Sequence, residues 1–110
     1  MIKRNLYSTQ EVLLADVAKS LSHPARVKIL KLLMLKSPQS AAEIVSQIPL
    51  AQATVSQHLS ELKHAQLIKD KKQGNKVFYS VNKPTLSKSF RLFNELFSFS
   101  QNAVQQVKLF

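Results

Sequence analysis

The 110-residue sequence contains no cysteine and no tryptophan, and Gly74 is its only glycine. The lack of cysteine excludes disulfide bonds, thiolate metal sites and thiol-based redox sensing. No apolar run is long enough for a signal peptide or a membrane span, so we expect a cytoplasmic protein. The sequence also offers no nucleophile–base pair, no paired carboxylates and no glycine-rich phosphate loop. It therefore predicts a protein that is not an enzyme and needs no cofactor.

Acidic residues are scarce, with 6 Asp and Glu against 16 Lys and Arg and a formal charge of +10. Such an excess indicates a polyanionic partner, with nucleic acid ahead of an anionic membrane surface. Charge alone leaves open a basic surface that only confers solubility. The length and the 45% hydrophobic fraction fit one folded domain over residues 1–110.

Capping boxes and prolines divide the N-terminal half into helices. The string STQE at 8–11 predicts a helix over 9–21, and Pro24 is placed to open a second helix that ends at Leu35. The string SAAE at 40–43 opens a short helix over 41–47, and another helix follows from about 51 to 64. Two short helices joined by a tight turn predict a helix-turn-helix over residues 41–64.

After Gln66 the pattern becomes strand-like. Residues 67–72 and 76–81 predict two strands joined by 73–75, where Gly74 supplies the positive φ of a hairpin tip. A hairpin directly after a helix-turn-helix predicts a wing at 67–81. Pro84 opens a last helix over 84–108. The predicted fold is mainly α with a small β-hairpin, a winged helix-turn-helix with about five helices and a two-stranded wing.

The helix at 51–64 has two faces. Its outer face is uncharged near the N-terminus, so a DNA major groove could accept it closely, and Gln57 could pair with adenine. A solvated helix face is the alternative, and only the hairpin and the charge balance favour DNA. His58 lies beside the buried stripe and is predicted to be partly buried. The inner stripe is Val55, Leu59 and Leu62, and the outer face is Ala53, Gln57, Ser60 and His64, flanked by Thr54 and Ser56.

The wing and the last helix suggest two further surfaces. Lys72 and Lys76 near the hairpin tip would neutralise phosphates, unless they only keep a sheet edge soluble. The last helix carries more aromatic surface than a small domain covers alone, which predicts a homodimer, unless these residues pack only on their own domain. The predicted interface residues are Leu13, Val17, Leu21, Leu86, Phe90, Phe93, Phe97 and Val104.

Segments 21–30 (LSHPARVKIL), 51–59 (AQATVSQHL) and 74–79 (GNKVFY) resemble the ArsR/SmtB family of bacterial regulators. The resemblance spans about residues 12–81. It implies a homodimeric repressor that binds inverted half-sites on double-stranded DNA, with the first and last helices at the interface. It also implies DNA contacts at Gln52, Ala53, Thr54, Ser56, Gln57, His58, Lys72 and Lys76, to which the helical wheel adds Ser60, and a structural or phosphate-binding role for Arg26.

Three departures from the family pattern stand out. Val45 and Gln47 occupy the positions of a metal-binding cysteine pair, and after Pro84 only Glu95 could ligate a metal. Ala51 replaces the usual Ser or Thr cap of the recognition helix, which would cost about 1 kcal/mol unless another group caps it. The histidines are scattered along the chain, and His64 with Glu61 gives too few ligands, so no metal site is expected. The three histidines are His23, His58 and His64.

An alternative function is a winged-helix module that binds protein and has only non-specific affinity for DNA. The uncharged outer face of the helix at 51–64 fits this alternative, and the basic wing argues against it. The sequence leaves the inducing signal open. An organic ligand in the dimer interface, a partner protein and no signal at all are each compatible with it.

Overall fold

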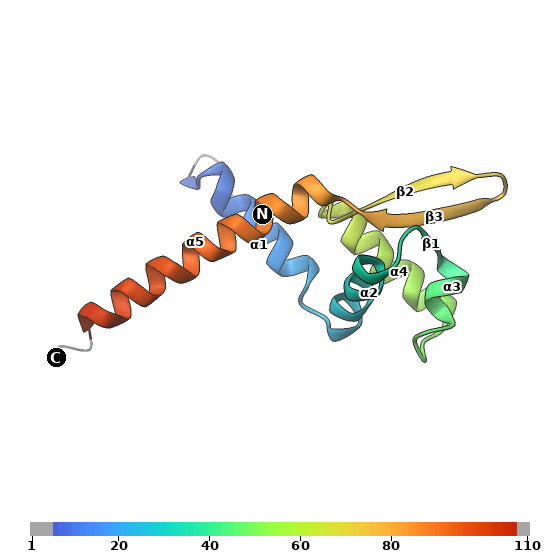
Figure 1. Cartoon of the computed structure of the whole chain (residues 1–110), viewed down its shortest axis with the longest axis horizontal. Coiled ribbons are helices and arrows are strands. Elements are labelled where there is room, and N and C mark those ends of the chain that lie inside the picture. The colour runs from blue at the N-terminus through green and yellow to red at the C-terminus, as the bar shows by residue number, and fades with distance from the viewer. Residues whose placement is uncertain (1–5, 108–110) are drawn as a thin grey trace.

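The computed structural model describes the backbone of residues 6–107 and the side chains of residues 6–99. It is mainly helical with one small sheet, and it confirms the predicted winged helix-turn-helix (Figure 1). The elements in chain order are α1 (Thr9–Ser20), α2 (Pro24–Leu35), β1 (Gln39–Ser40), α3 (Ala41–Val45), α4 (Gln52–His64), β2 (Ile68–Gln73), β3 (Lys76–Val81) and α5 (Lys83–Val107).

Both predicted capping boxes are present. The Ser8 hydroxyl accepts a hydrogen bond from the Glu11 backbone N–H at 3.0 Å, and the Glu11 carboxylate accepts from the Ser8 N–H at 2.9 Å. The corresponding distances between Ser40 and Glu43 are 3.2 and 3.1 Å. These bonds satisfy N–H groups that a helix start leaves without a partner, so α1 and α3 begin where the sequence predicts.

The sheet has three strands, where the sequence predicted two. The strand order is β1-β3-β2, all antiparallel, and β1 adds the pairs Gln39 with Tyr79 and Ser40 with Phe78. Gln39 is only 2% exposed, and its amide donates to the Lys36 carbonyl at 2.7 Å and the Leu32 carbonyl at 3.2 Å. The chain therefore continues past the end of α2 in a fixed extended form, where we expected only a break.

The hairpin is tighter than predicted. Gln73 pairs with Lys76, so only Gly74 and Asn75 form the loop. Gly74 has φ 66°, whereas Asn75 is not in the positive-φ region, and this combination is typical of a type II′ hairpin turn. Gln66 also has positive φ, at 63°, in the turn after α4. There the N–H of Leu67 bonds the Leu62 carbonyl at 3.1 Å, which closes the helix end.

One hydrophobic core joins α2, α3, α4 and the base of the wing. The predicted inner stripe of α4 is confirmed, because all three of its apolar side chains are fully buried. α1 contributes one residue to this cluster, Val17, at 1% exposure. The buried cluster consists of Val17, Ile29, Leu30, Leu33, Ile44, Ile48, Val55, Leu59, Leu62, Leu67 and Ile68.

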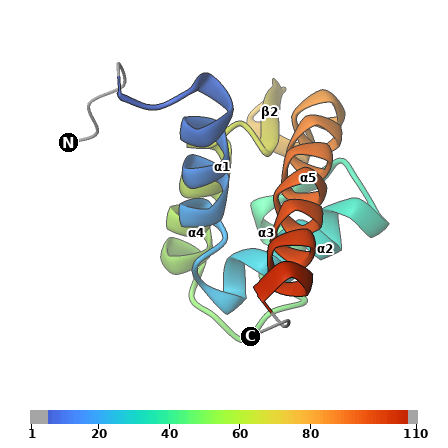
Figure 2. The same ribbon diagram turned by 90° about the vertical axis from the view of Figure 1, so that its left-hand side faces the viewer.

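α1 and α5 lie side by side, as the view along the molecule shows (Figure 2). The molecule is elongated, measuring 59 × 30 × 24 Å, because the wing projects at one end and the second half of α5 at the other (Figure 1). Within residues 6–107, no helix has the length and apolar character needed to cross a membrane. The wing and the distal part of α5 are thus the two most extended features of the fold.

Candidate nucleic-acid interface

The outer face of α4 is free of contacts that would cover it. Its predicted DNA-contacting side chains, apart from His58, are all exposed, and the first turn carries no acidic residue. Ala51 is the N-cap and makes no side-chain cap bond, as expected from the departure at this position. The exposed set is Gln52, Ala53, Thr54, Ser56, Gln57 and Ser60. This face offers amide and hydroxyl groups on a helix that the core holds from behind.

His58 lies on the inner side of the same helix. It is 7% exposed, and its Nδ1 accepts a hydrogen bond from Arg26 Nε at 3.1 Å. Burial, and then the neighbouring charges of His23 and Arg26, lower the pKa of His58 from its usual value. The structure thus gives Arg26 a structural bond and places His58 apart from the exposed set.

His23 and His58 come together although the sequence suggested scattered histidines. Their ring centroids are 4.5 Å apart, and the rings are tilted by 48°. His23 is the N-cap of α2, and its Nδ1 accepts from the Ala25 N–H at 3.0 Å. Two imidazoles give two ligands at most. Among the described residues, no three His, Asp or Glu side chains lie close enough to share a metal ion.

The two positions where related regulators were expected to carry cysteines serve the fold here. Val45 is half-buried against the core. Gln47 donates from Nε2 to Gln39 Oε1 at 2.7 Å and to the Glu43 carbonyl at 2.8 Å. Gln47 therefore links α3 to β1, an internal contact that the sequence alone did not reveal.

The wing carries exposed lysines and one compensated acid. Lys71, Lys72 and Lys76 are all exposed around the hairpin tip. Asp70 accepts a hydrogen bond from Lys63 Nζ at 2.8 Å, and this bond raises the pKa of Lys63. Because Lys63 lies near the end of α4, the ion pair joins the base of the wing to the recognition helix. Sequence reasoning missed the pair, whose partners stand seven residues apart across a turn.

The residues predicted for a dimer interface lie in different environments. Phe90 and Phe97 are strongly exposed, at 74% and 61%. Phe99 was not predicted for the interface, although it continues the same apolar pattern, and it is 73% exposed. Val17 lies in the core of its own chain, so it cannot contribute side-chain surface to a partner. The half-buried members are Leu13, Leu21, Leu86 and Phe93, and Val104 lies outside the described side chains.

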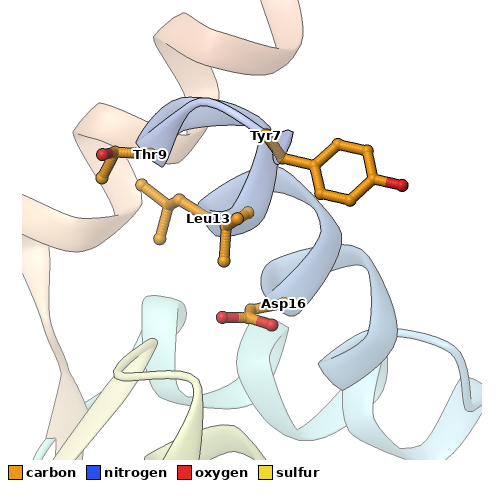
Figure 3. Close-up of a pocket in the computed structure, with 5 residues that line it drawn as sticks. Tyr7, Thr9, Leu13 and Asp16 are labelled. Atoms are coloured by element: carbon orange, nitrogen blue, oxygen red, sulfur yellow. The ribbon is translucent and has the colours of Figure 1, made fainter. Parts of the chain in front are cut away.

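Two of the hollows that α1 lines differ in character. One, of about 410 Å³, opens between α1, α2 and α5 and is almost entirely apolar, with Met34 and Phe90 at its sides. The other, of about 260 Å³, lies on α1 itself and holds a single carboxylate, that of Asp16. Figure 3 shows the Tyr7 ring pointing away from this carboxylate. Neither hollow brings together the acid, base and nucleophile that a catalytic site requires.

Known proteins share both the sequence and the fold. Residues 23–70 match the family described as bacterial regulatory protein, arsR family. The transcriptional repressor PagR of Bacillus anthracis is 32% identical over 82 residues, which cover 74% of this chain and 82% of that protein. The transcriptional repressor SdpR of Bacillus subtilis is 35% identical over 74 residues, which cover 67% and 81% of the two chains.

Two solved structures show the same architecture. An ArsR-like transcriptional regulator from Rhodococcus sp. RHA1 superimposes with a TM-score of 0.77, at 24% identity, over 93% of this chain and 95% of its own. A homodimeric winged helix-turn-helix DNA-binding domain from Mycobacterium bovis, solved by NMR, gives 0.63 at 21% identity over 96% and 95%. These likenesses establish the fold, and the sequence matches establish the family, whose members are regulatory proteins and not enzymes. The chain belongs to the arsR family of bacterial regulatory proteins.

Proposed function

We propose that this protein is a homodimeric transcriptional repressor that binds an operator with inverted half-sites on double-stranded DNA. Residues 1–110 act as a single cytoplasmic winged-helix unit, which senses no metal through cysteines. The observation that carries the proposal is the exposed polar face of α4 beside a basic wing. PagR and SdpR, both named as repressors, support repression over activation.

α4 and the wing have different roles in DNA binding. Gln57 on α4 reads base edges, because an amide can both donate to and accept from adenine in the major groove. Lys72 and Lys76 on the wing contact phosphates, which contributes affinity but little sequence choice. The outer face of α4 has no lysine or arginine before Lys63, so most of the electrostatic attraction must come from outside that face.

The test is fluorescence anisotropy on the DNA upstream of the protein's own gene and on a scrambled duplex, across a salt series. We expect tight, sequence-dependent binding with a steep salt slope. Gln57→Ala reduces the preference for the upstream duplex, whereas Lys76→Ala weakens binding to both duplexes and lowers the salt slope by about one. Lys88→Ala is the matched control, because this substitution removes the same charge from the side of α5 that borders α1.

Equal, weak binding of the wild-type protein to both duplexes would contradict the proposal. It would favour the alternative, a winged-helix module that binds another protein. Equal effects of Gln57→Ala and Lys76→Ala on both duplexes would instead contradict only the division of roles between α4 and the wing.

The dimer rests on the uncovered aromatic face of α5. Exposed apolar patches of this kind mark interaction surfaces, and the M. bovis neighbour with this fold is homodimeric. A two-fold arrangement presents two recognition helices about 34 Å apart, one turn of DNA. We expect Phe97→Lys to yield monomers in sedimentation velocity, whereas Leu35→Lys, at an 84%-exposed site on α2, leaves the dimer intact.

A further inference from the structure

Arg26 contacts two helices besides its own. Its Nε donates to Nδ1 of His58 on α4 at 3.1 Å. Its Nη1 points to the last carbonyls of α1, at 3.4 Å from Ser20 O and 3.5 Å from Lys19 O. One half-buried guanidinium thus joins the end of α1 and the start of α2 to the middle of the recognition helix.

This contact fixes the protonation state of His58. A guanidinium has only donors, so Nδ1 of His58 must offer a free lone pair. In the neutral ring the proton therefore sits on Nε2. Protonation of Nδ1 would place an N–H against the N–H of Arg26 and a second positive charge beside the first. The Arg26–His58 bond can exist only while His58 is neutral.

We propose that Arg26 and His58 are positioning residues, which hold α4 in its DNA-binding orientation only while His58 is neutral, so that DNA affinity falls on acidification. The inference rests on the proposed function, since it assumes that α4 enters DNA. His58 itself makes no contact with the DNA. It acts through the bond to Arg26, from the buried side of the helix.

Three charged or titratable groups face His58. Arg26 and His23 lie on and before α2, and Glu61 lies on α4 itself. His23 contributes in the same direction as Arg26, because protonating its ring adds positive charge next to His58. Only Glu61 favours the protonated ring, and it is exposed.

The expected change of DNA affinity with pH is opposite in sign to the change expected for a histidine that contacts DNA. A histidine at a phosphate gains positive charge as the pH falls, so DNA binding tightens. Here the folded, DNA-competent form releases the proton, so binding is full above the pKa of His58 and is lost as the pH falls through it. With one linked proton, the affinity falls at most about tenfold per pH unit below that pKa.

The experiment measures the dissociation constant of the full-length protein for the upstream duplex from about pH 8 to about pH 5.5, at constant ionic strength. His58→Asn is the informative variant, because the asparagine Oδ1 replaces Nδ1 as acceptor and does not titrate. We expect it to bind as wild type does at the high-pH end and to lose most of the acid-induced weakening. His58→Leu, which keeps no acceptor, binds more weakly throughout. His64→Asn, on the outer face at the exposed end of α4, still shows the acid-induced weakening, whatever its own effect on the affinity.

A merely structural role for His58 would appear as a loss of fold in its variants. Thermal melts of each variant separate loss of fold from loss of orientation, and NMR of the imidazole carbons reports the tautomer in the absence of DNA. A neutral His58 with its proton on Nε2 and an acid-weakened affinity support the proposal. Binding that tightens on acidification, a His58→Asn profile as steep as wild type, or an Nδ1–H tautomer overturns it. Failure of the wild-type protein to prefer its upstream duplex contradicts the proposed function instead, and the tautomer still tests the bond.

Discussion

α4 begins without the side-chain cap that α1 and α3 have, and Ala51→Ser should supply it. Ala51 has φ −65° and ψ 150°, close to the values −68° and 159° of Ser8 and −77° and 164° of Ser40, which both cap their helices. A serine therefore needs no backbone change to accept from the N–H of Thr54. Such a cap contributes about 1 kcal/mol to the free energy of unfolding. For a domain of this size, that raises the melting temperature by roughly 4–8 °C.

Thermal unfolding followed by circular dichroism checks the prediction, at one fixed protein concentration because dimerisation shifts the melting temperature. Ala53→Ser is the matched control. It adds the same hydroxyl two residues later, at an exposed position in the first turn of α4 that is not the N-cap, so no gain in melting temperature is expected. If Ala51→Ser melts no higher than Ala53→Ser, another group already caps α4 and the reasoning is wrong.

The same position separates stability from DNA binding. Ala51→Asp also caps the helix, and its negative charge interacts favourably with the helix dipole. We expect it to raise the melting temperature as serine does but to weaken DNA binding, because it places a carboxylate next to Gln52 and Ala53, for which the family resemblance implies DNA contacts. An aspartate variant that binds DNA as tightly as the serine variant would argue against the placement of the α4 N-terminus at the DNA.

Four further substitutions test single positions of the fold. Leu59→Ala, at a fully buried site, should lower the free energy of unfolding in urea by about 3–5 kcal/mol, and a loss below 1 kcal/mol would show that α4 is held differently. Gly74→Ala should lower the free energy of unfolding by about 1–2 kcal/mol through its positive φ alone, since no atom lies within 4 Å of the added Cβ. Gln66→Gly should instead stabilise the turn after α4 in the same urea titration. Asp70→Asn removes an exposed ion pair with Lys63, so the melting temperature should hardly change while DNA affinity rises at low salt; a large loss of stability would contradict this.

Local signals predicted most of the fold. The capping boxes at Ser8 and Ser40, Pro24 at the start of α2 and Gly74 at the hairpin tip each act through bonds or dihedral angles within a few residues. Such signals can be recognised in a sequence because the interactions behind them involve residues that are close along the chain. β1 escaped prediction for the opposite reason. Its two residues become a strand only by pairing with β3, some forty positions further along the chain.

The orientation of His58 shows the limit of a helical wheel. The wheel places it beside the buried stripe, where a small rotation of the helix decides between core and groove. The resemblance to a family counted it among the DNA contacts, whereas the wheel favoured partial burial. The deciding contact comes from Arg26, 32 residues earlier and on another helix. Neither residue carries a sequence signal for this bond, because each is also common in solvated or phosphate-binding positions.

The apolar residues of α1 and α5 show why periodicity cannot separate a core from an interface. Val17 and Phe97 follow the same kind of helical repeat, yet Val17 is 1% exposed and Phe97 is 61% exposed. The difference lies in what stands opposite each residue. α1 lies over the core, whereas the distal half of α5 projects beyond the rest of the chain (Figure 1). A repeat shows that a helix has an apolar face, and only the arrangement of neighbours shows whether the same chain covers it. The exposed phenylalanines therefore argue for a second subunit more strongly than the repeat from which they were predicted.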